Sequence, residues 1–261
     1  MKIGFIGLGI MGESMCENIV KKHDDIVYCF DFVQEKLDLL ASKGAVPCAD
    51  SLELARKSDV IISMVPKSEH SMSVYKGILE ALDSSKTCID MSTIDPSVSV
   101  QIAEMVKKTG AQFIDAPVVK SKPAAIAGKL GIYTGGDEAV CEAMRPILAY
   151  MGENIIRMGD NGKGLVMKIC HNALVTQIQN GVNETLALAQ LNGISVAAED
   201  YSTAFSMANA AKDVGICMNL AKECGLEMPG EANVQQVYQK ALDAGMGPDD
   251  WRSTFKIVRG R

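Results

Sequence analysis

Three glycines in one short turn constrain the fold of this chain more than any other feature. They have the spacing G-x-G-x-x-G, and they stand between an apolar run that begins at Lys2 and a helical pattern over residues 11–22. In such a turn the first glycine permits a tight bend, the second lets a pyrophosphate approach, and the third allows close packing of helix on strand. The unpaired N–H groups at the helix start attract phosphate. A purely structural turn is the alternative to a dinucleotide site at Gly7, Leu8, Gly9, Ile10, Met11 and Gly12.

Apolar runs and helical patterns alternate through the first half of the chain. Parallel strands that are buried on both faces are continuously apolar, as these runs are, and alternation with helices of about 10–15 residues indicates βαβ units. We therefore expect an α/β fold with a Rossmann-type doubly wound parallel sheet. The predicted strands are 2–7, 25–30, 60–65, 88–91 and 113–116, and the predicted helices are 11–22, 34–43 and 98–108.

The second half of the chain changes character. Residues 164–192 lack proline and contain one interior glycine, Gly181, which predicts an unusually long helix, and helical patterns follow over 205–224 and 231–244. Glycine and polar residues cluster at 159–164 and mark a junction. We therefore predict an NAD-binding domain over 1–161 and an all-helical substrate and dimerisation domain over 162–261. The apolar faces of the long helix favour a homodimer or homotetramer.

An acidic residue ends the second predicted strand. Asp31 follows Gly7 by 24 positions (31 − 7), where a carboxylate accepts hydrogen bonds from the adenosine ribose and repels a 2′-phosphate. Phe32 and Val33 come next and offer no arginine for such a phosphate. This pattern favours NAD over NADP, although Asp31 could instead only cap the following turn.

Composition and charge exclude several classes of function. The formal net charge of −6, without a strongly basic stretch, argues against nucleic acid as a partner. No apolar run approaches the roughly 20 residues that span a bilayer, and the N-terminus lacks the features of a signal peptide. The eight scattered cysteines are expected to be reduced and mostly buried, which favours a cytoplasmic location. Only three histidines occur, none at metal-ligand spacing, so we expect no metal site.

Five ordered motifs resemble those of the β-hydroxyacid dehydrogenase family, and the resemblance extends over nearly the whole chain. The first motif is the glycine turn with its flanks, Phe5 to Met15, and the second is Asp90-Met91-Ser92-Thr93. The other three are Asp115-Ala116-Pro117-Val118, then Gly162-Lys163-Gly164 with Lys168 and Asn172, and finally Lys212-Asp213. The resemblance implies that Val65 and Pro66 lie on the adenosine side of NAD, that Thr93 contacts its nicotinamide ribose and that Lys212 reaches the cofactor. It also implies that Lys168 is catalytic and that Asn172 binds substrate.

The chemistry of Lys168 and Asn172 also follows from their spacing. They are four residues apart on a predicted helix, so both side chains project from one face. A lysine whose pKa is lowered to ~7–8 can take the hydroxyl proton when an alcohol is oxidised, and its ammonium can return it to a carbonyl. Asn172 would hold the substrate oxygen or orient the lysine, and the adjacent His171 would line the substrate pocket. A solvated helix face is the alternative, but the neighbouring residues are apolar.

One loop departs from the family pattern. Most members continue the third motif with Ser-Gly-Gly, whereas this chain has Val119-Lys120-Ser121. We expect Lys120 and Ser121 to contact an anionic substrate, and the positive charge would suit a strongly charged head group such as a sulfonate. The loop is in this respect similar to that of sulfolactaldehyde reductase. The alternative is that Lys120 and Lys122 are simply solvated.

The chain is also short between its long helix and Lys212. Family members usually carry a further segment there, whereas Ser195 to Tyr201 leads almost directly to Phe205. Either a helix over the active site is absent or residues are missing from the sequence, and we favour missing residues.

The sequence thus predicts an NAD-dependent 3-hydroxyacid dehydrogenase or semialdehyde reductase that resembles 3-hydroxyisobutyrate dehydrogenase. It would move a hydride between NAD(H) and a short anionic 3-hydroxy acid or its semialdehyde, with Lys168 as general acid and base. Three alternatives stay open. They are a 3-sulfolactaldehyde reductase specifically, a non-catalytic NAD-binding sensor, and an imine reductase, although imine reductases generally replace this lysine.

Overall fold

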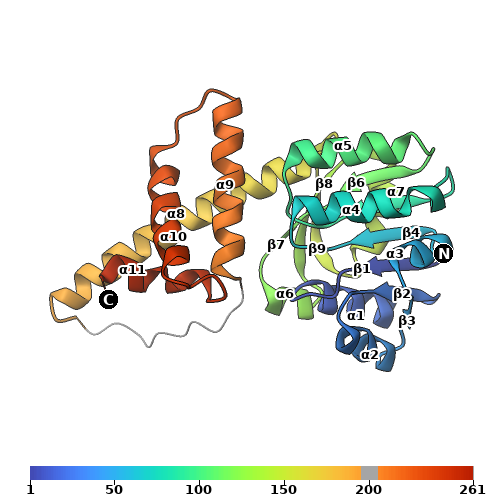
Figure 1. Cartoon of the computed structure of the whole chain (residues 1–261), viewed down its shortest axis with the longest axis horizontal. Coiled ribbons are helices and arrows are strands. Elements are labelled where there is room, and N and C mark those ends of the chain that lie inside the picture. Colours follow the sequence, from blue (N-terminus) through green and yellow to red (C-terminus); the bar gives the residue numbers. More distant parts are fainter. Residues whose placement is uncertain (195–204, 261) are drawn as a thin grey trace. The chain divides into compact units, whose positions relative to one another are not determined.

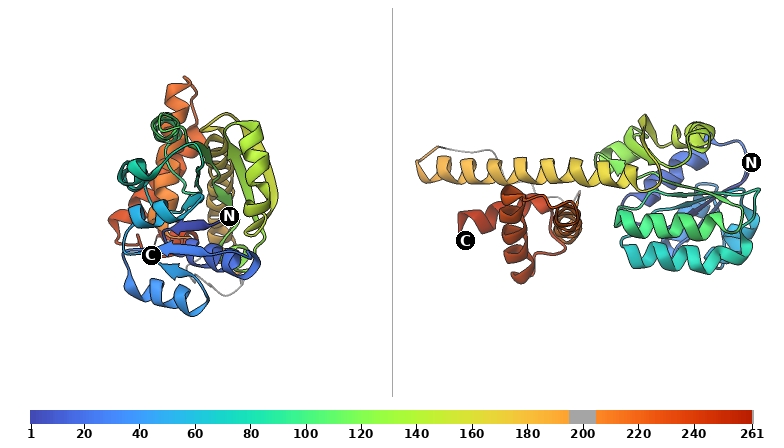
Figure 2. Two further views of the ribbon diagram at one scale, coloured as in Figure 1. Left: turned by 90° about the vertical axis from the view of Figure 1, so that its right-hand side faces the viewer. Right: turned by 90° about the horizontal axis from the view of Figure 1, so that it is seen from above.

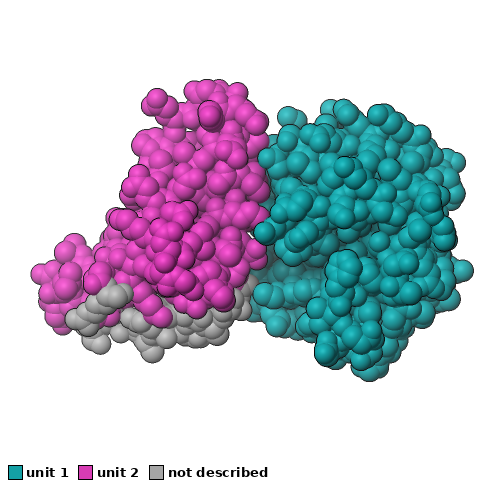
Figure 3. Space-filling model, in the orientation of Figure 1, with its two compact units in different colours: residues 1–168 teal, residues 169–261 magenta. Residues whose placement is uncertain are grey.

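The structure is a computed structural model that describes residues 1–194 and 205–260. It divides into two compact units, Met1–Lys168 and Ile169–Arg261 (Figure 3). The division falls inside the long helix, and the predicted domain boundary between residues 161 and 162 stays a prediction. The short connection after the long helix, Ser195 to Tyr201, lies outside the described residues.

Strands and helices alternate in the first unit (Figure 1). Its strands are β1 (Ile3–Ile6), β2 (Val27–Phe30), β3 (Val46–Pro47), β4 (Val60–Ser63), β5 (Thr87–Asp90), β6 (Gln112–Asp115), β7 (Val118–Val119), β8 (Leu130–Gly135) and β9 (Gly152–Gly159). Its helices are α1 (Gly12–Lys22), α2 (Gln34–Ser42), α3 (Ser51–Lys57), α4 (Ser68–Ile78), the 3-10 turn η1 (Leu79–Ala81), α5 (Pro96–Lys107), α6 (Lys122–Ile126) and α7 (Glu138–Leu148). All five predicted strands are present.

The strands form one sheet with the order β3-β2-β1-β4-β5-β6-β8-β7, and β9 pairs with β8. From β3 to β6 all neighbours are parallel, and the chain reverses its direction of progress between β1 and β4, which is the switch point of a doubly wound fold. Beyond β6 the sheet is mixed, because β8 runs antiparallel to β6 and to β7. The fold class is thereby confirmed, with an antiparallel extension that the sequence did not indicate.

Helices cover both faces of the sheet. On β4, Val60 and Ile62 pack with α1, α2 and α7, whereas Ile61 between them packs with α3, α4 and α5. Because successive side chains of a strand point to opposite faces, one apolar strand supplies both cores. The parallel arrangement therefore places the loops after β1, β2, β4, β5 and β6 at one edge of the sheet, where ligands of such folds bind.

The second unit is helical within its described residues. The long helix α8 (Lys163–Leu191) begins in the first unit and runs on without interruption (Figure 2). It is followed by α9 (Met207–Glu223), α10 (Pro229–Asp243), the 3-10 turn η2 (Trp251–Ser253) and α11 (Thr254–Arg259). Three side-chain contacts tie α8 to the later helices, from Thr176 and Gln177 to the buried Glu231 and from Asn183 to Thr254. No helix among residues 1–194 and 205–260 is long and apolar enough to cross a membrane.

Candidate active site

The glycine turn has the geometry that its three glycines permit. Gly7 has a φ of +96°, and a Cβ there would lie 2.3 Å from the carbonyl oxygen of Met64. A Cβ on Gly12 would lie 1.9 Å from the carbonyl oxygen of Gly7, so only glycine lets α1 start this close to β1. Gly9 differs, because a Cβ there would meet nothing within 4 Å. The space that Gly9 leaves is open, as the approach of a pyrophosphate to the backbone requires.

Asp31 is tied to the glycine turn by its carboxylate. The backbone N–H of Leu8 donates to Oδ2 at 2.6 Å, and the N–H of Val33 donates to Oδ1 at 2.9 Å. The side chain therefore joins the end of β2 to the turn after β1. The sequence predicted a ribose contact for Asp31, which stays a prediction, and it did not anticipate that this carboxylate also holds the glycine turn.

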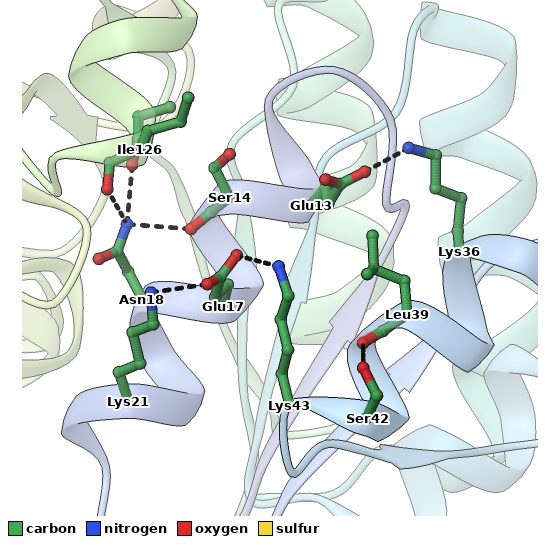
Figure 4. Close-up of polar contacts among 11 residues, drawn as sticks. Glu13, Ser14, Glu17, Asn18, Lys21, Lys36, Leu39, Ser42, Lys43 and Ile126 are labelled. Carbon is green, nitrogen blue, oxygen red and sulfur yellow. Dashed lines mark hydrogen bonds and ion pairs between the residues drawn. The ribbon is translucent and has the colours of Figure 1, made fainter.

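Helix α1 is fixed on both sides (Figure 4). Glu13 and Glu17 form ion pairs with Lys36 and Lys43 of the α2 region. On the other side, the buried amide Nδ2 of Asn18 donates to the carbonyl oxygen of Ala125 in α6 at 2.7 Å. Since α6 directly follows Lys120 and Ser121, the helix behind the glycine turn also anchors the loop expected to bind substrate.

A buried polar network supports the loops after β4 and β5. The N–H of Val65 donates to Ser92 Oγ at 2.9 Å, and the N–H of Ser92 donates to Asp90 Oδ1 at 3.0 Å. Ser63 Oγ also donates to Asp90 Oδ1, at 3.1 Å, and shares a hydrogen bond with Tyr75 Oη at 2.8 Å. Burial raises the pKa of Asp90, whose side chain is almost fully enclosed. The network links two loops for which the resemblance implied cofactor contacts.

The expected cofactor residues of those loops lie at their outer ends. Val65 is half-buried and Pro66 is exposed after β4, and Thr93 is half-buried after β5. Their place at the carboxyl edge of the sheet agrees with the prediction, and their contacts with a cofactor stay predictions. Sequence reasoning missed Asp90 and Ser63 as supports, although an acid at the end of an apolar strand is itself a signal.

The loop after β7 departs from what the sequence suggested. Lys120 has a φ of +74°, the left-handed conformation that favours glycine, at a position where the family pattern has glycine. Its ammonium lies 3.0 Å from Glu153 Oε1 and donates to the carbonyl oxygen of Lys129 at 2.8 Å. Ser121 is exposed at the start of α6. Both residues stay predicted substrate contacts, but Lys120 already has a counter-ion.

Lys168 lies in the second turn of α8, and only 9% of its surface is exposed. The first turn of this helix is held by Asp115, which accepts the N–H groups of Gly162 at 2.6 Å and of Leu165 at 3.1 Å. Burial raises the pKa of Asp115 to about 6. The alternative for Lys168 was a position on a solvated helix face. The burial of its side chain is inconsistent with that alternative.

In the second unit a buried carboxylate joins two expected site residues. Asn172 Nδ2 donates to Asp213 Oδ2 at 2.6 Å, and Lys212 Nζ lies 3.3 Å from Asp213 Oδ1. Asp213 is 3% exposed, whereas Asn172 and the neighbouring His171 are half-buried. The structure thus brings Asn172 and Lys212 together through Asp213, a residue to which the sequence assigned no role.

Two family models match the chain. Residues 2–159 match the family model described as the NAD binding domain of 6-phosphogluconate dehydrogenase. Residues 194–258 match the model described as NAD-binding of NADP-dependent 3-hydroxyisobutyrate dehydrogenase.

Relatives match the chain over almost its full length. It is 30% identical to 2-(hydroxymethyl)glutarate dehydrogenase of Eubacterium barkeri, covering 98% of this chain and 94% of the relative. It is 29% identical to glyoxylate/succinic semialdehyde reductase 1 of Arabidopsis thaliana, with 99% of both covered. A solved structure of 3-hydroxyisobutyrate dehydrogenase from Mycobacterium tuberculosis with L-serine is similar, with a TM-score of 0.91, 26% identity and 99% of both chains covered. The chain belongs to the β-hydroxyacid dehydrogenase family and is an oxidoreductase that uses NAD(P).

Proposed function

We propose that this protein moves a hydride between NAD(H) and a short anionic 3-hydroxy acid or its semialdehyde. The single observation that carries the proposal is the burial of Lys168 near the start of α8, on a helix held by a charged anchor at Asp115. The family comparisons support the reaction class, because the named relatives are dehydrogenases and semialdehyde reductases.

The preference for NAD over NADP rests on Asp31. Its carboxylate lies at the end of β2 and is held by two backbone N–H groups, so it cannot easily move aside. A 2′-phosphate would meet this negative charge directly, whereas ribose hydroxyls can donate to it. Phe32 and Val33, which follow Asp31 and are exposed, have uncharged side chains, so neither supplies a cation for a phosphate.

We assign the proton transfer to and from the substrate oxygen to Lys168. When bound, the nicotinamide cofactor supplies the hydride or accepts it. Lys168 Nζ takes the hydroxyl proton of the alcohol in oxidation and returns a proton to the carbonyl oxygen in reduction. Asn172 follows one turn later on α8, and Asp213 holds its amide with Nδ2 as the donor to the carboxylate. Its amide oxygen is therefore left to accept a hydrogen bond, as from a substrate hydroxyl.

We assign the binding of the substrate's anionic head group to the loop at Lys120 and Ser121. Support comes from charge, because Lys120, Lys122 and Lys129 all belong to this short segment. The Lys120–Glu153 pair is exposed on both sides, and such pairs contribute about 0–1 kcal/mol, so a substrate anion can compete for the ammonium. The same charge favours a 3-sulfolactaldehyde reductase as the second candidate.

A screen of substrates tests the proposed function. Purified enzyme is given NADH or NADPH with short semialdehydes that carry a carboxylate, a sulfonate or a phosphate, and with a neutral aldehyde of equal length. We expect NADH to be oxidised with at least one anionic substrate. Its kcat/KM should be at least about tenfold higher than with NADPH in place of NADH, and at least about tenfold higher than with the neutral aldehyde. A tenfold ratio corresponds to a free-energy difference of ~1.4 kcal/mol. A sulfonate in first place would select the second candidate, and equal rates with the neutral aldehyde would refute an anionic substrate.

The same screen with Lys120→Ala and Lys122→Ala tests the loop. Lys120→Ala should change the ranking of head groups, and Lys122→Ala, the matched control two residues away, should not. An unchanged ranking in Lys120→Ala would remove this residue from the substrate site.

We also propose that α8 mediates self-association. Leu174, Ile178 and Leu188 lie on one stripe of the helix by their spacing, and they are 61%, 57% and 65% exposed. Apolar side chains in such a row are covered in most proteins, and a second copy of this chain offers the same stripe for a symmetric contact.

Glutamate on this stripe should separate the subunits. Wild-type protein is expected to sediment as a dimer or larger, and Leu174→Glu/Ile178→Glu to raise the dissociation constant by about 100-fold or more, since each buried side chain contributes ~1.5–3 kcal/mol. Leu226→Glu, which changes an equally exposed leucine (59%) outside α8, is the control. Analytical ultracentrifugation reads the outcome, and a monomeric wild type would contradict the proposal.

A further inference from the structure

A buried carboxylate lies where the end of β6 meets the start of α8. Asp115 is the last residue of β6, and its side chain is fully enclosed. Oδ1 accepts the N–H of Gly162 at 2.6 Å, and Oδ2 accepts the N–H of Leu165 at 3.1 Å. The two oxygens thus hold two different N–H groups at the beginning of the helix, which fixes its rotation as well as its distance from the sheet.

The surroundings of Asp115 leave its carboxylate little freedom. A Cβ on Gly135 would lie 2.6 Å from Oδ1, and a Cβ on Gly164 would lie 2.8 Å from Oδ2. The neighbouring turn has an anchor of its own, because Asn161 Nδ2 donates to the carbonyl oxygens of Phe113 and Gly135. The start of α8 is therefore fastened to both β6 and β8.

The charge of Asp115 suits this place. The first N–H groups of a helix have no partner within it, and the positive end of the helix dipole favours an anion. With its pKa raised to about 6 by burial, Asp115 is ionised at neutral pH. A charged acceptor at a helix start makes hydrogen bonds roughly twice as strong as a neutral one.

We propose that Asp115 is a positioning residue for the reaction, which sets the place of Lys168 by holding the first turn of α8. Leu165 precedes Lys168 by three residues, less than one helical turn, so a displacement at Leu165 is carried directly to the lysine. Asp115 is also followed at once by Ala116 to Ser121, the segment that leads to the expected anion contacts. This inference rests on the proposed role of Lys168.

Asp115→Asn tests the inference. The amide keeps the shape of the carboxylate, but its NH₂ group must face one of the two N–H donors. We expect kcat to fall about 100-fold, as for a catalytic group misplaced by roughly 1 Å, with KM for NADH within about twofold of wild type. The primary isotope effect on kcat with deuterated NADH should increase, because the chemical step becomes slower than cofactor release.

Asp137→Asn is the matched control. Asp137 caps α7 in the same unit, accepting the N–H of Val140 at 3.1 Å, and it has no place in the proposed site. This variant should lose thermal stability while keeping the wild-type kcat and isotope effect. A merely structural role for Asp115 would give the same result as Asp137→Asn, and that outcome would overturn the inference.

Two further variants keep the test decisive. If Asp115→Asn does not bind NADH in a fluorescence titration, Asp115→Ser replaces it, because a hydroxyl retains one acceptor and introduces no amide donor. Lys168→Ala is measured in parallel. If Lys168→Ala turns over normally, the proposed function fails. If it is inactive while the Asp115 variant that binds NADH has the wild-type kcat, only the positioning role fails.

Discussion

Replacement of Lys168 by alanine is expected to lower kcat by about 10³-fold, because general acid–base groups contribute roughly 10²–10⁴ to the rate. The lysine is 9% exposed in the second turn of a helix that Asp115 anchors, whereas Lys163, the other lysine of α8, is exposed at the first residue of the helix. KM for NADH should stay within about threefold of wild type, since the expected cofactor residues are those of the loops after β1, β2, β4 and β5 together with Lys212 of α9, and Lys168 is not among them. Steady-state kinetics with the best substrate of the screen measures both constants.

Lys163→Ala is the control for this prediction. Lys163 is the first residue of α8 and is exposed, so its loss removes the same charge from the same helix without touching the buried position. It should retain the wild-type kcat. If Lys168→Ala also retains kcat, the proton is handled elsewhere. An NADH-binding protein with no turnover in any variant would instead favour the sensor.

Much of the fold could be predicted because its signals are local. Continuous apolar runs such as 60–65 follow from burial of a strand on both faces, and the glycine turn follows from backbone geometry at Gly7 and Gly12. The long helix was predicted over 164–192 and extends over Lys163–Leu191. These features need only sequence neighbours, so periodicity and glycine placement suffice.

The rest depends on partners that are distant in sequence. After the buried Gly152, strand β9 has only exposed and half-buried residues in place of an apolar run, so nothing in 152–159 indicated its pairing with β8. The ion pair of Lys120 with Glu153 depends on that same pairing, and it could not be foreseen from the loop alone. Asp115 and Asp213 were noticed only as parts of motifs, because their acceptor roles involve residues 47 and 41 positions away.

Two glycines of the same short turn, Gly9 and Gly12, should respond in opposite ways to alanine. At Gly9 a Cβ meets nothing within 4 Å, so Gly9→Ala should melt within about 2 °C of wild type, as expected for a change below ~0.5 kcal/mol. The added methyl group would nevertheless occupy the space through which a pyrophosphate reaches the backbone. We therefore expect KM for NADH to rise at least about tenfold, which is ~1.4 kcal/mol of lost binding.

At Gly12 the clash is with the protein itself. A Cβ there would lie 1.9 Å from the carbonyl oxygen of Gly7, a backbone atom that a side-chain rotation cannot move. Helix α1 must then shift away from β1, and we expect a loss of about 3 kcal/mol or more and a melting temperature lower by about 10 °C. Differential scanning fluorimetry with and without NADH separates the two variants, because only Gly9→Ala should keep the wild-type melting temperature while losing its stabilisation by NADH. Stabilisation of Gly9→Ala by NADH equal to that of wild type would mean that no pyrophosphate binds at this turn, and the cofactor site would have to be placed elsewhere on the sheet edge.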